Sequence, residues 1–476
     1  MFPHTPHPEL QIRHSQNNMN TLLWFQRDLR LHHNPSLDWA LSQSKPVIAV
    51  YIHSPQEDAP WSEGAASRWW LQQSLSSLKK DLLELNINLH CIKGNSVEKI
   101  NSWVNKHNID SVVWTNRVEP NRVKCENTIE AQLNKQNITV KRFTPGLLPS
   151  PSKFLTLSNE TAYRVFTPFY RRLRAELNFS DYYPKSSQHI KNTISKEEIK
   201  LKDKYLISNL DLLDTHNWHS KLNKYWTHGE GSAHKMLDHF IEDKILNYIP
   251  DRDYPATDAT SSLSAHLHFG EISLQQVLSA LIPLIQGNSI NHSVAAEGFL
   301  RQLIWREYAQ YIMYHFPHTA LKPMNEKYKP NFWKDDKEML QKWQQGNTGI
   351  TLVDAGMKQL WETGSMHNRV RMLVASLLTK NMGINWQHGA NWFWDTLVDA
   401  DLANNSMGWQ WVAGCGVDAA PYFRIFNPDT QSKKFDKNNA YSNYWLQPDR
   451  LINDEIIDLG SSRKEALVRY KTQIKN

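Results

Sequence analysis

The chain has 476 residues, of which 40% are hydrophobic and 21% charged, and its formal net charge is +6. These values are typical of a globular protein with two or three domains, and no apolar run is long enough to cross a membrane. Three cysteines at unrelated spacings argue against a disulfide framework and against a zinc site, so we predict no metal and a reducing cytoplasm.

Residues 1–18 are polar and lack the apolar core of a secretory signal, and we expect them to be disordered. From residue 19 to 145, five short apolar runs predict buried strands. The runs are TLLWF (21–25), PVIAVYI (46–52), INLHCI (87–92), SVVWTN (111–116) and ITVKRF (138–143). Helix-like segments separate these runs, which predicts an α/β domain with a parallel, doubly wound sheet. No GxGxxG follows the first run, so the usual dinucleotide fingerprint is missing.

Residues 146–225 contain proline and serine clusters and charged runs, and we expect a connection between domains there. From residue 226 to 476 the strand pattern ends and helical periodicity replaces it. One helix face is marked by Val370, Leu373, Val374, Leu377 and Leu378. We therefore predict a large all-α C-terminal domain.

A cluster of hydroxyls occupies a predicted helix start in the segment TSSLS (260–264). Such hydroxyls can cap the helix. They can also form a phosphate seat together with the free backbone N–H groups of a helix start. The sequence leaves both interpretations open.

The segment FLRQLIWREYAQY (299–311) predicts a helix packed through its apolar residues. Arg306 and Glu307 are then expected to form a solvated ion pair. Nothing in this segment alone indicates a function.

Arg369 and Arg371 stand two residues apart in the segment MHNRVRM (366–372). One can point outward to a nucleic-acid phosphate. The other can point inward to a carboxylate, for which Asp399 and Asp401 are the candidates. His367 has no second metal-binding residue at helical spacing, which favours a structural role.

Tryptophan is unusually frequent, with 19 tryptophans against 16 phenylalanines. Two of them, Trp409 and Trp411, flank a single glutamine. Residues at positions i and i+2 of a helix point to nearly opposite sides, so these two rings cannot share a face.

Taken together, the motifs resemble the photolyase/cryptochrome family, and within it the bacterial photolyases that repair cyclobutane pyrimidine dimers. The resemblance extends from about residue 20 to residue 450. Nine motifs follow in the family's order, namely WFQRDLRLHHNPSL (24–37), VFTPFYRR (165–172), TSSLS (260–264), LIWREY (303–308), TGITLVDAGMKQL (348–360), MHNRVRM (366–372), DADLANN (399–405), GWQW (408–411) and DAAPYFRIFNP (418–428).

The resemblance implies that the helical domain holds reduced FAD. The hydroxyl cluster would seat the diphosphate, and Asp399 and Asp401 would hold the ribose and the flavin edge. Asn405 would face flavin N5, where an amide accepts a hydrogen bond from the reduced flavin. The implied FAD-binding residues are Tyr248, Thr260, Ser261, Ser262, Leu263, Ser264, Asn368, Arg371, Asp399, Ala400, Asp401 and Asn405.

The reaction implied is light-driven DNA repair. Excited, reduced FAD gives an electron to a flipped-out dimer, which splits into two pyrimidines. Trp305 and Trp411 would be aromatic walls that stack on the flipped bases. The implied DNA- and lesion-binding residues are Arg252, Gln302, Trp305, Asn368, Arg369, Met372, Trp411, Arg424 and Gln431. An electron relay that reduces FAD would consist of Trp409, Trp386 and Trp333.

Three positions depart from the family pattern. Gln302 stands where photolyases of this type commonly have glutamate, and glutamine cannot share a proton with a thymine radical anion. Ser365 replaces an aromatic residue, and Met407 replaces a small one.

The family resemblance also implies a second, light-harvesting chromophore, which is methenyltetrahydrofolate or a deazaflavin or flavin. Glu119 loosely matches a pterin-holding glutamate, and a surface carboxylate is the alternative interpretation. The implied partner is UV-damaged DNA that contains pyrimidine dimers. We expect a monomer in the bacterial cytoplasm, away from membranes and associated with the nucleoid when bound to DNA.

Three other functions remain to be weighed. A cryptochrome would have the same fold and FAD but would signal without repair, and the absence of a long C-terminal extension counts against it. A photolyase for (6-4) photoproducts would use a histidine pair at the lesion, which the segment Ser365-Met366-His367 fits badly. A basic DNA-binding protein without chemistry would leave the FAD motifs unexplained.

Overall fold

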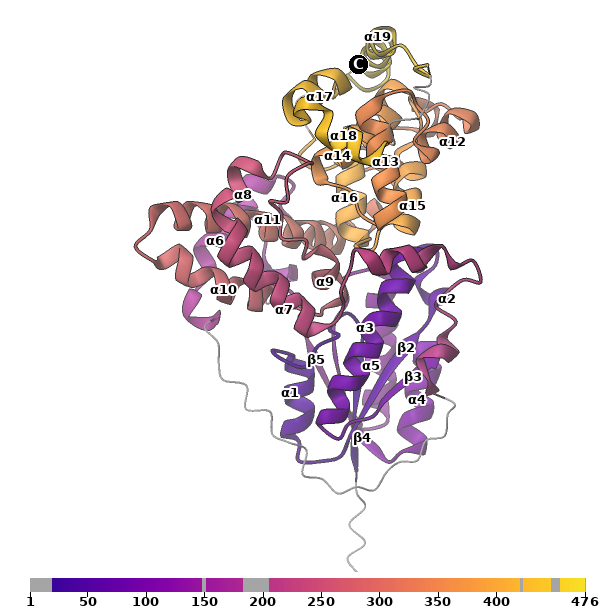
Figure 1. The fold of residues 1–476 in the computed structure, drawn as a ribbon. Helices are drawn as coiled ribbons and strands as arrows, with labels where there is room; N and C mark the ends of the chain where they lie inside the picture. Colours follow the sequence, from indigo (N-terminus) through magenta and orange to yellow (C-terminus); the bar gives the residue numbers. More distant parts are fainter. Residues whose placement is uncertain (1–18, 148–150, 183–204, 420–422, 447–453, 476) are drawn as a thin grey trace, which may run out of the picture.

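The computed structural model describes residues 19–147, 151–182, 205–419, 423–446 and 454–475. The extension predicted to be disordered, residues 1–18, lies outside this part. In Figure 1 an α/β domain occupies the lower half of the molecule, and helices form two lobes above it.

The α/β domain contains one five-stranded sheet in the order β3-β2-β1-β4-β5, and all of its strand pairs are parallel. Each of the five predicted strands is present. The strands are β1 (Asn20–Phe25), β2 (Val47–His53), β3 (Leu89–Lys93), β4 (Ile109–Thr115) and β5 (Thr139–Phe143). In register, Leu23 pairs with Ala49 on one side and with Val113 on the other.

Helices cover both faces of this sheet because the apolar residues of β1 point alternately to either side. Leu23 and Phe25 join a core with the helices on one face, and Leu22 and Trp24 join a second core on the other. The first face carries α1 (Pro35–Ser42) and α3 (Ala65–Glu84), and the second carries α4 (Ser96–Lys106) and α5 (Pro120–Lys135). A short helix, α2 (Pro55–Asp58), follows β2. The predicted doubly wound sheet is thereby confirmed.

The first helical lobe is built around α11 (Ile290–His315), a helix of 26 residues. Its other helices are α6 (Phe166–Glu176), α7 (Glu230–His239), α8 (Ile245–Asp251), α9 (Ser264–Phe269) and α10 (Leu274–Gln286). A π-helical turn, Phe240–Lys244, joins α7 to α8. Residues of α6 are buried in the same core as α11, so this part of the predicted connection packs into the lobe.

The second helical lobe extends from α12 to the end of the chain and has its own core. Its helices are α12 (Lys337–Gln345), α13 (Thr351–Thr363), α14 (Asn368–Ser376), α15 (Trp386–Thr396), α16 (Leu402–Ala413), α17 (Pro428–Phe435), α18 (Ala440–Trp445) and α19 (Leu459–Tyr470). Two π-helical turns, Leu377–Asn381 and Lys471–Lys475, extend α14 and α19. All five residues of the predicted apolar face on α14 and its extension are buried.

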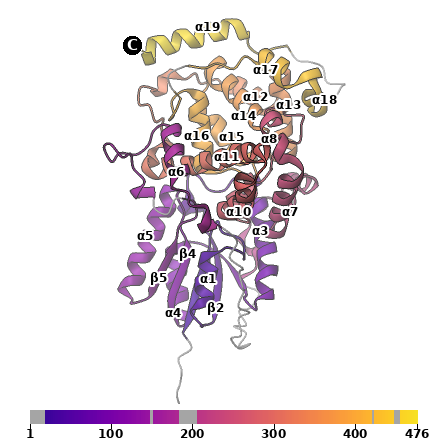
Figure 2. The ribbon, with the colours of Figure 1, turned by 90° about the vertical axis from the view of Figure 1, so that its left-hand side faces the viewer.

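Short 3-10 turns complete the described chain, at Pro151–Lys153, Phe179–Tyr182, Ile207–Leu210, Asn217–Lys224, Pro317–Ala320, Pro330–Phe332 and Lys437–Asn439. Figure 2 shows α16 near the middle of the helical part, where it packs against α11, α14 and α15. No helix in the described ranges is long and apolar enough to span a membrane. The α/β domain and the all-α C-terminal part match the predicted fold class.

Candidate active site

The residues predicted to hold a cofactor converge on one buried carboxylate, that of Asp399. Arg371 on α14 donates from Nη2 to both Asp399 carboxylate oxygens, each at 3.1 Å. Ser264, the first residue of α9, donates to the same carboxylate at 2.7 Å. Burial would raise the pKa of Asp399, but the Arg371 charge and the Ser264 hydroxyl lower the pKa below its ordinary value. Of the two neighbouring arginines, Arg371 is therefore the one that points inward, as the family resemblance implies, and it fixes an anion between two helices.

The hydroxyl segment at 260–264 does not cap a helix with its side chains. The N-cap of α9 is Leu263, and it makes no side-chain cap bond. Ser261 Oγ accepts a long bond of 3.4 Å from Leu263 N–H, and Ser262 has a left-handed φ of 53°. Thr260, Ser261 and Ser262 are half-buried. The capping interpretation is wrong because an apolar residue occupies the cap, and the phosphate seat remains a prediction.

Asp401, the second predicted acid, has a different environment from Asp399. It is the N-cap of α16 and accepts a 2.9 Å bond from the backbone N–H of Asn404. Arg306 Nη2 and His268 Nδ1 each lie 3.3 Å from its other oxygen. Burial would raise the pKa of Asp401, but Arg306 and His268 lower the pKa well below its ordinary value. The Asp401 carboxylate thus ties the start of α16 to α9 and α11.

Arg306 and Glu307 do not form the solvated ion pair that the sequence suggests. Arg306 bonds to Asp401, and Glu307 accepts a 2.9 Å bond from the backbone N–H of Leu147. Glu307 is only 3% exposed. Adjacent helical residues point in different directions, so each of the two charges joins α11 to a separate segment.

Asn405 lies one turn into α16, and its amide orientation is fixed. Its Nδ2 donates to the backbone carbonyl of Ala390 on α15 at 3.0 Å. The Oδ1 end is therefore the end that faces away from this bond as an acceptor. An acceptor is what the predicted contact with the N5–H of reduced flavin requires.

The polar side chains around Asn405 and Asp399 fit the polar edge of FAD. They offer a fixed carboxylate, an amide oxygen and several hydroxyls, which match ribose, flavin and phosphate groups. Within the described residues, no group of three or more metal-ligating side chains could hold a metal ion.

Of the other residues implied to hold the cofactor, Tyr248 and Ala400 are buried and Asn368 is exposed. Tyr248 is buried on α8 and meets Phe299 of α11 edge-on at 5.3 Å. Ala400 is buried between the two acids. Asn368 is exposed, and its Nδ2 lies 3.9 Å from Met372 Sδ.

The three tryptophans of the predicted relay lie on neighbouring segments. Trp409 on α16 is 3% exposed, and Trp386 at the start of α15 is 1% exposed. Trp333 is half-buried, and the next residue, Lys334, donates a 2.8 Å backbone bond to Gly383 shortly before Trp386. The exposure rises from the first two rings to the third, as a route from the interior to the surface requires, although electron transfer along it stays a prediction.

The Trp409 ring packs directly against Gly389 of α15, where only a residue without a side chain leaves room for it. A Cβ at Gly389 would lie 2.1 Å from Cη2 of the Trp409 ring. We therefore expect Gly389→Ala to displace the ring and to cost about 1–3 kcal/mol of unfolding free energy through overpacking. Urea unfolding measures the loss, and the rate of flavin reduction under light measures the displacement.

Gly408 offers a matched control, because it is adjacent to Trp409 and a Cβ there meets nothing within 4 Å. Gly408→Ala should leave the rate of flavin reduction unchanged, and its stability in urea unfolding should rise by roughly 0.5–1 kcal/mol as helical backbone entropy is saved. Equal behaviour of the two variants would contradict this packing role of Gly389.

The two predicted walls of the lesion pocket lie on different helices. Trp411 is half-buried on α16 and meets Phe426 at 6.4 Å, whereas Trp409 on the same helix is buried against α15. Trp305 is half-buried on α11, one turn after Gln302. The Gln302 amide makes a long 3.5 Å bond to the Gly298 carbonyl. The opposite environments of Trp409 and Trp411 agree with their i, i+2 spacing.

The side chains predicted to contact DNA differ in how freely they can move. Arg369 Nη2 lies 2.5 Å from a carboxylate oxygen of Asp253. Arg424 is exposed, and Arg252 is half-buried at the end of α8. Gln431 has a buried Oε1 without a hydrogen-bond partner among the described residues. Binding of DNA by these residues remains a prediction.

His367 has the structural role that the sequence favours. It is the N-cap of α14, and its Nδ1 accepts a 3.2 Å bond from the backbone N–H of Arg369. Burial lowers the pKa of His367 to about 4, so the ring is neutral near pH 7.

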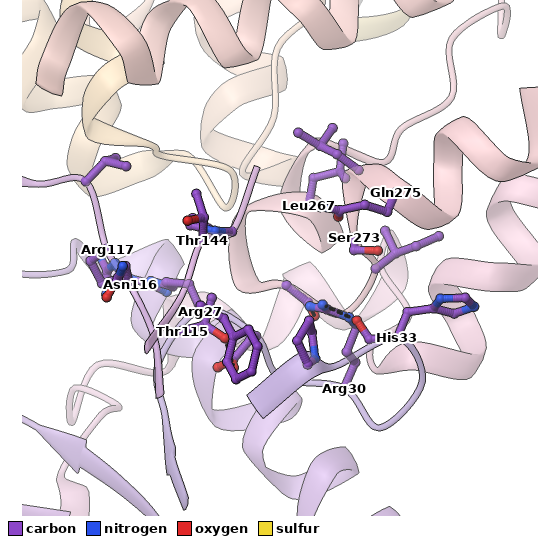
Figure 3. A pocket seen from close by; sticks show the side chains of 18 of the residues that line it. Arg27, Arg30, His33, Thr115, Asn116, Arg117, Thr144, Leu267, Ser273 and Gln275 are labelled. Atoms are coloured by element: carbon purple, nitrogen blue, oxygen red, sulfur yellow. Dashed lines mark hydrogen bonds between the residues drawn. The ribbon is translucent and has the colours of Figure 1, made fainter. Parts of the chain in front are cut away.

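A cavity of about 610 Å³ lies between the sheet and the helices (Figure 3). Arg27, Asn116 and Thr144 line it, and they follow β1, β4 and β5. From the helical side it is lined by Ser273 and Gln275, among others. The sequence interpretation missed these residues. The signal was available, because ligands of open parallel sheets bind beyond the carboxyl ends of the strands where the strand order reverses, here at β1 and β4.

Glu119 lines this cavity and a second one of about 100 Å³ on its other side. Its carboxylate accepts bonds from Arg117 Nε at 2.9 Å and Nη2 at 2.5 Å. Burial would raise the pKa of Glu119, but Arg117 lowers the pKa to about 2. The surface-carboxylate interpretation is wrong, since the Glu119 side chain is only 17% exposed and belongs to an inner ion pair.

Comparison with known proteins identifies related chains for both parts of the molecule. A family model for DNA photolyase matches residues 21–189, and a model for the FAD binding domain of DNA photolyase matches residues 299–473. The deoxyribodipyrimidine photo-lyase of Agrobacterium fabrum is 39% identical over 424 residues, which is 88% of this chain and 85% of that protein.

Cryptochrome-2 of Arabidopsis thaliana is also similar, at 31% identity over 90% of this chain and 70% of its own length. Among solved structures, a bacterial class III photolyase from Agrobacterium tumefaciens matches with a TM-score of 0.86 and 34% identity. The match covers 98% of this chain and all of that one.

Proposed function

Because the chain belongs to the photolyase/cryptochrome family, we propose that it is a DNA photolyase that splits cyclobutane pyrimidine dimers under blue or near-UV light. The observation that supports this most is the arrangement on α16. Asn405 presents an amide acceptor, and Trp409 and Trp411 follow it on opposite sides of the same helix.

FAD binding follows from the family, and we propose how this chain holds the cofactor. Asp399, kept ionised by Arg371, would accept hydrogen bonds from hydroxyls of the cofactor. The hydroxyl segment at 260–264 would donate to its phosphates. Bound, reduced FAD supplies the light-driven electron that opens the cyclobutane ring. The protein's own contribution is to bind, orient and exclude water.

The proposed substrate is UV-damaged DNA with the dimer turned out of the helix. Flipping costs a few kcal/mol, less for a damaged pair, and stacking on aromatic side chains offsets that cost. Trp305 and Trp411 would stack on the dimer, and Arg252, Arg369 and Arg424 would bind phosphates. We propose that the protein acts as a monomer in the bacterial cytoplasm.

The interdomain cavity suits a second chromophore. Its volume of about 610 Å³ falls within the range of small-molecule sites, and its lining combines Arg27 and Arg30 with polar side chains. We propose that it binds the light-harvesting pigment, a folate, a deazaflavin or a second flavin. The absorption spectrum of the purified protein identifies which of these is present.

The alternatives within the family are a cryptochrome and a (6-4) photolyase. Plant cryptochromes are among the relatives, so the fold alone does not separate signalling from repair. His367 bears on the second alternative, because its neutral ring is engaged as a helix cap, whereas that chemistry uses a histidine pair.

One experiment separates these functions. The purified, flavin-loaded protein is reduced and illuminated with blue light in the presence of oligonucleotides that carry either a cyclobutane dimer or a (6-4) photoproduct. We expect loss of the cyclobutane dimer only. Loss of the (6-4) product would indicate the second alternative, and no repair of either would leave the cryptochrome.

Replacing Gln302 by glutamate tests the departure from the family pattern. A carboxylic acid near the lesion can share a proton with a thymine radical anion, which an amide cannot, so we expect Gln302→Glu to raise repair per absorbed photon by about 1.5- to 3-fold. Dimer loss per photon, measured on the reduced protein, gives the ratio. An unchanged yield would show that position 302 is unimportant for the splitting step.

A further inference from the structure

Trp305, the predicted wall on α11, is stacked on a second aromatic ring, that of Phe166. The Phe166 ring lies parallel to it, with the ring centroids 3.5 Å apart and 9° between the planes. Tyr308 meets the same tryptophan edge-on at 5.8 Å. One face of Trp305 is therefore covered by an aromatic ring, while the side chain as a whole stays half-buried.

A cation also lies over the Phe166 ring. The Arg301 guanidinium lies 5.0 Å from the Phe166 centroid and 4.6 Å from that of Tyr170. Arg301 precedes Trp305 by one turn on α11, so two residues of the same helix contact Phe166. Phe166 reaches them from α6 and is 1% exposed.

The start of α6 also lies beside a third segment. Burial raises the pKa of Asp418, which follows α16, and the nearby backbone N–H of Phe166 at the start of α6 opposes that rise. Asp418 and Trp411 line one small cavity together. The segment that follows α16, the helix of Trp411, therefore lies next to Phe166, which covers one face of Trp305.

We propose that Phe166 is a positioning residue for recognition of the flipped lesion, because it fixes the plane of the Trp305 ring on which a pyrimidine would stack. This inference rests on the proposed function, in which Trp305 is a wall of the lesion pocket. It gives a role to the motif VFTPFYRR (165–172), which neither cofactor binding nor the relay requires.

The physical reason is preorganisation. A base gains its full stacking contact only when the partner ring already lies in the right plane, and a ring free to rotate must be ordered at the moment of binding. Phe166 removes that freedom in the unbound protein. Its loss should therefore weaken binding of the flipped lesion and leave contacts to the DNA backbone intact, since those come from arginines elsewhere.

The test compares Phe166→Leu with two other variants. Phe166→Tyr keeps the aromatic ring and should rescue the effect. Phe169→Leu is the matched control, because Phe169 is equally buried on α6 and its ring contacts are with Phe154, Tyr163, Tyr308 and Tyr311. Dissociation constants are measured for an oligonucleotide with one cyclobutane dimer and for the same undamaged sequence, together with thermal unfolding and repair per photon at saturating substrate.

We expect Phe166→Leu to raise the dissociation constant for the dimer about tenfold, with undamaged DNA and saturated repair unchanged within twofold. Phe169→Leu should lower thermal stability to a similar degree without the loss of dimer affinity. A dimer affinity that is unchanged in Phe166→Leu, or reduced equally in Phe169→Leu, would overturn the inference while the proposed function stands. A wild-type protein that does not prefer the dimer would overturn both.

Discussion

Replacing Arg371 by methionine is expected to weaken the binding of FAD strongly. The Asp399 carboxylate is 8% exposed, and Arg371 is the cation bonded to both of its oxygens. Breaking a buried pair from one side costs about 3–5 kcal/mol because a charge is left buried alone. We expect FAD affinity to fall by at least about a hundredfold, which is measured by the flavin retained on gel filtration and by titration of the apoprotein with FAD.

Arg369→Met is the matched control for this variant. Arg369 lies on the same helix, but its partner Asp253 is 41% exposed, so loss of this pair leaves little buried charge. This variant should keep its flavin. It should bind DNA more weakly at every sequence, and the salt slope of binding should fall by about 1. Full flavin retention in Arg371→Met would contradict the role given to the Asp399 pair.

The substitution Arg371→Met should also change how the stability of the protein depends on pH. In the wild-type protein the pKa of Asp399 is lowered, so its ion pair stabilises the fold above the ordinary pKa of 3.8 and the contribution is lost as pH falls further. Without Arg371, burial dominates and raises the pKa of Asp399 above the unfolded value. The stability gap between the two proteins should then widen as pH rises from about 3 to about 6, as urea unfolding at several pH values measures.

Trp409→Phe will separate flavin reduction from repair. Phenylalanine fills most of the space against Gly389 and Phe393, but it is far harder to oxidise than tryptophan. We expect light-driven flavin reduction to slow by at least about tenfold. Dimer repair by protein reduced chemically beforehand should be unchanged, because the relay is not needed once the flavin is reduced.

Trp394→Phe provides the comparison for Trp409→Phe. Trp394 lies on α15 with Trp386, but its Nε1 donates to the Ser62 carbonyl of the α/β domain and its ring meets Trp61. This variant should reduce its flavin at the wild-type rate. Wild-type photoreduction in Trp409→Phe would exclude Trp409 as an obligatory carrier.

The sheet could be predicted from sequence because its signal is local. A parallel strand covered on both faces is apolar along most of its length, as β2 shows with the sequence VIAVYIH, and such runs are visible without any tertiary information. The spacing of Arg369 and Arg371 also indicated that one of the two points inward, because two arginines at i and i+2 cannot both face the same partner. It did not indicate which one, and only the family resemblance named Arg371.

Three of the failures have a common physical cause, since each depends on residues far along the chain. Glu119 looked like a surface carboxylate, but Trp394 and Leu402 of the helical domain line a small cavity together with it. Glu307 looked solvated, but it binds Leu147, which is 160 positions away. The interdomain cavity was missed because it exists only where strand ends and helices meet.

Helix α16 has a consequence for what can change in this protein over evolution. It contains the amide at Asn405, the inner ring at Trp409 and the outer ring at Trp411 within twelve residues, with Asp401 at its start. One inserted residue would rotate everything after it by about 100°. Trp409 would then lose its contact with Phe393 of α15, and Trp411 would lose its contact with Phe426. The number of residues between Asp401 and Trp411 should therefore be more strictly conserved among functional descendants than the identity of most residues between them.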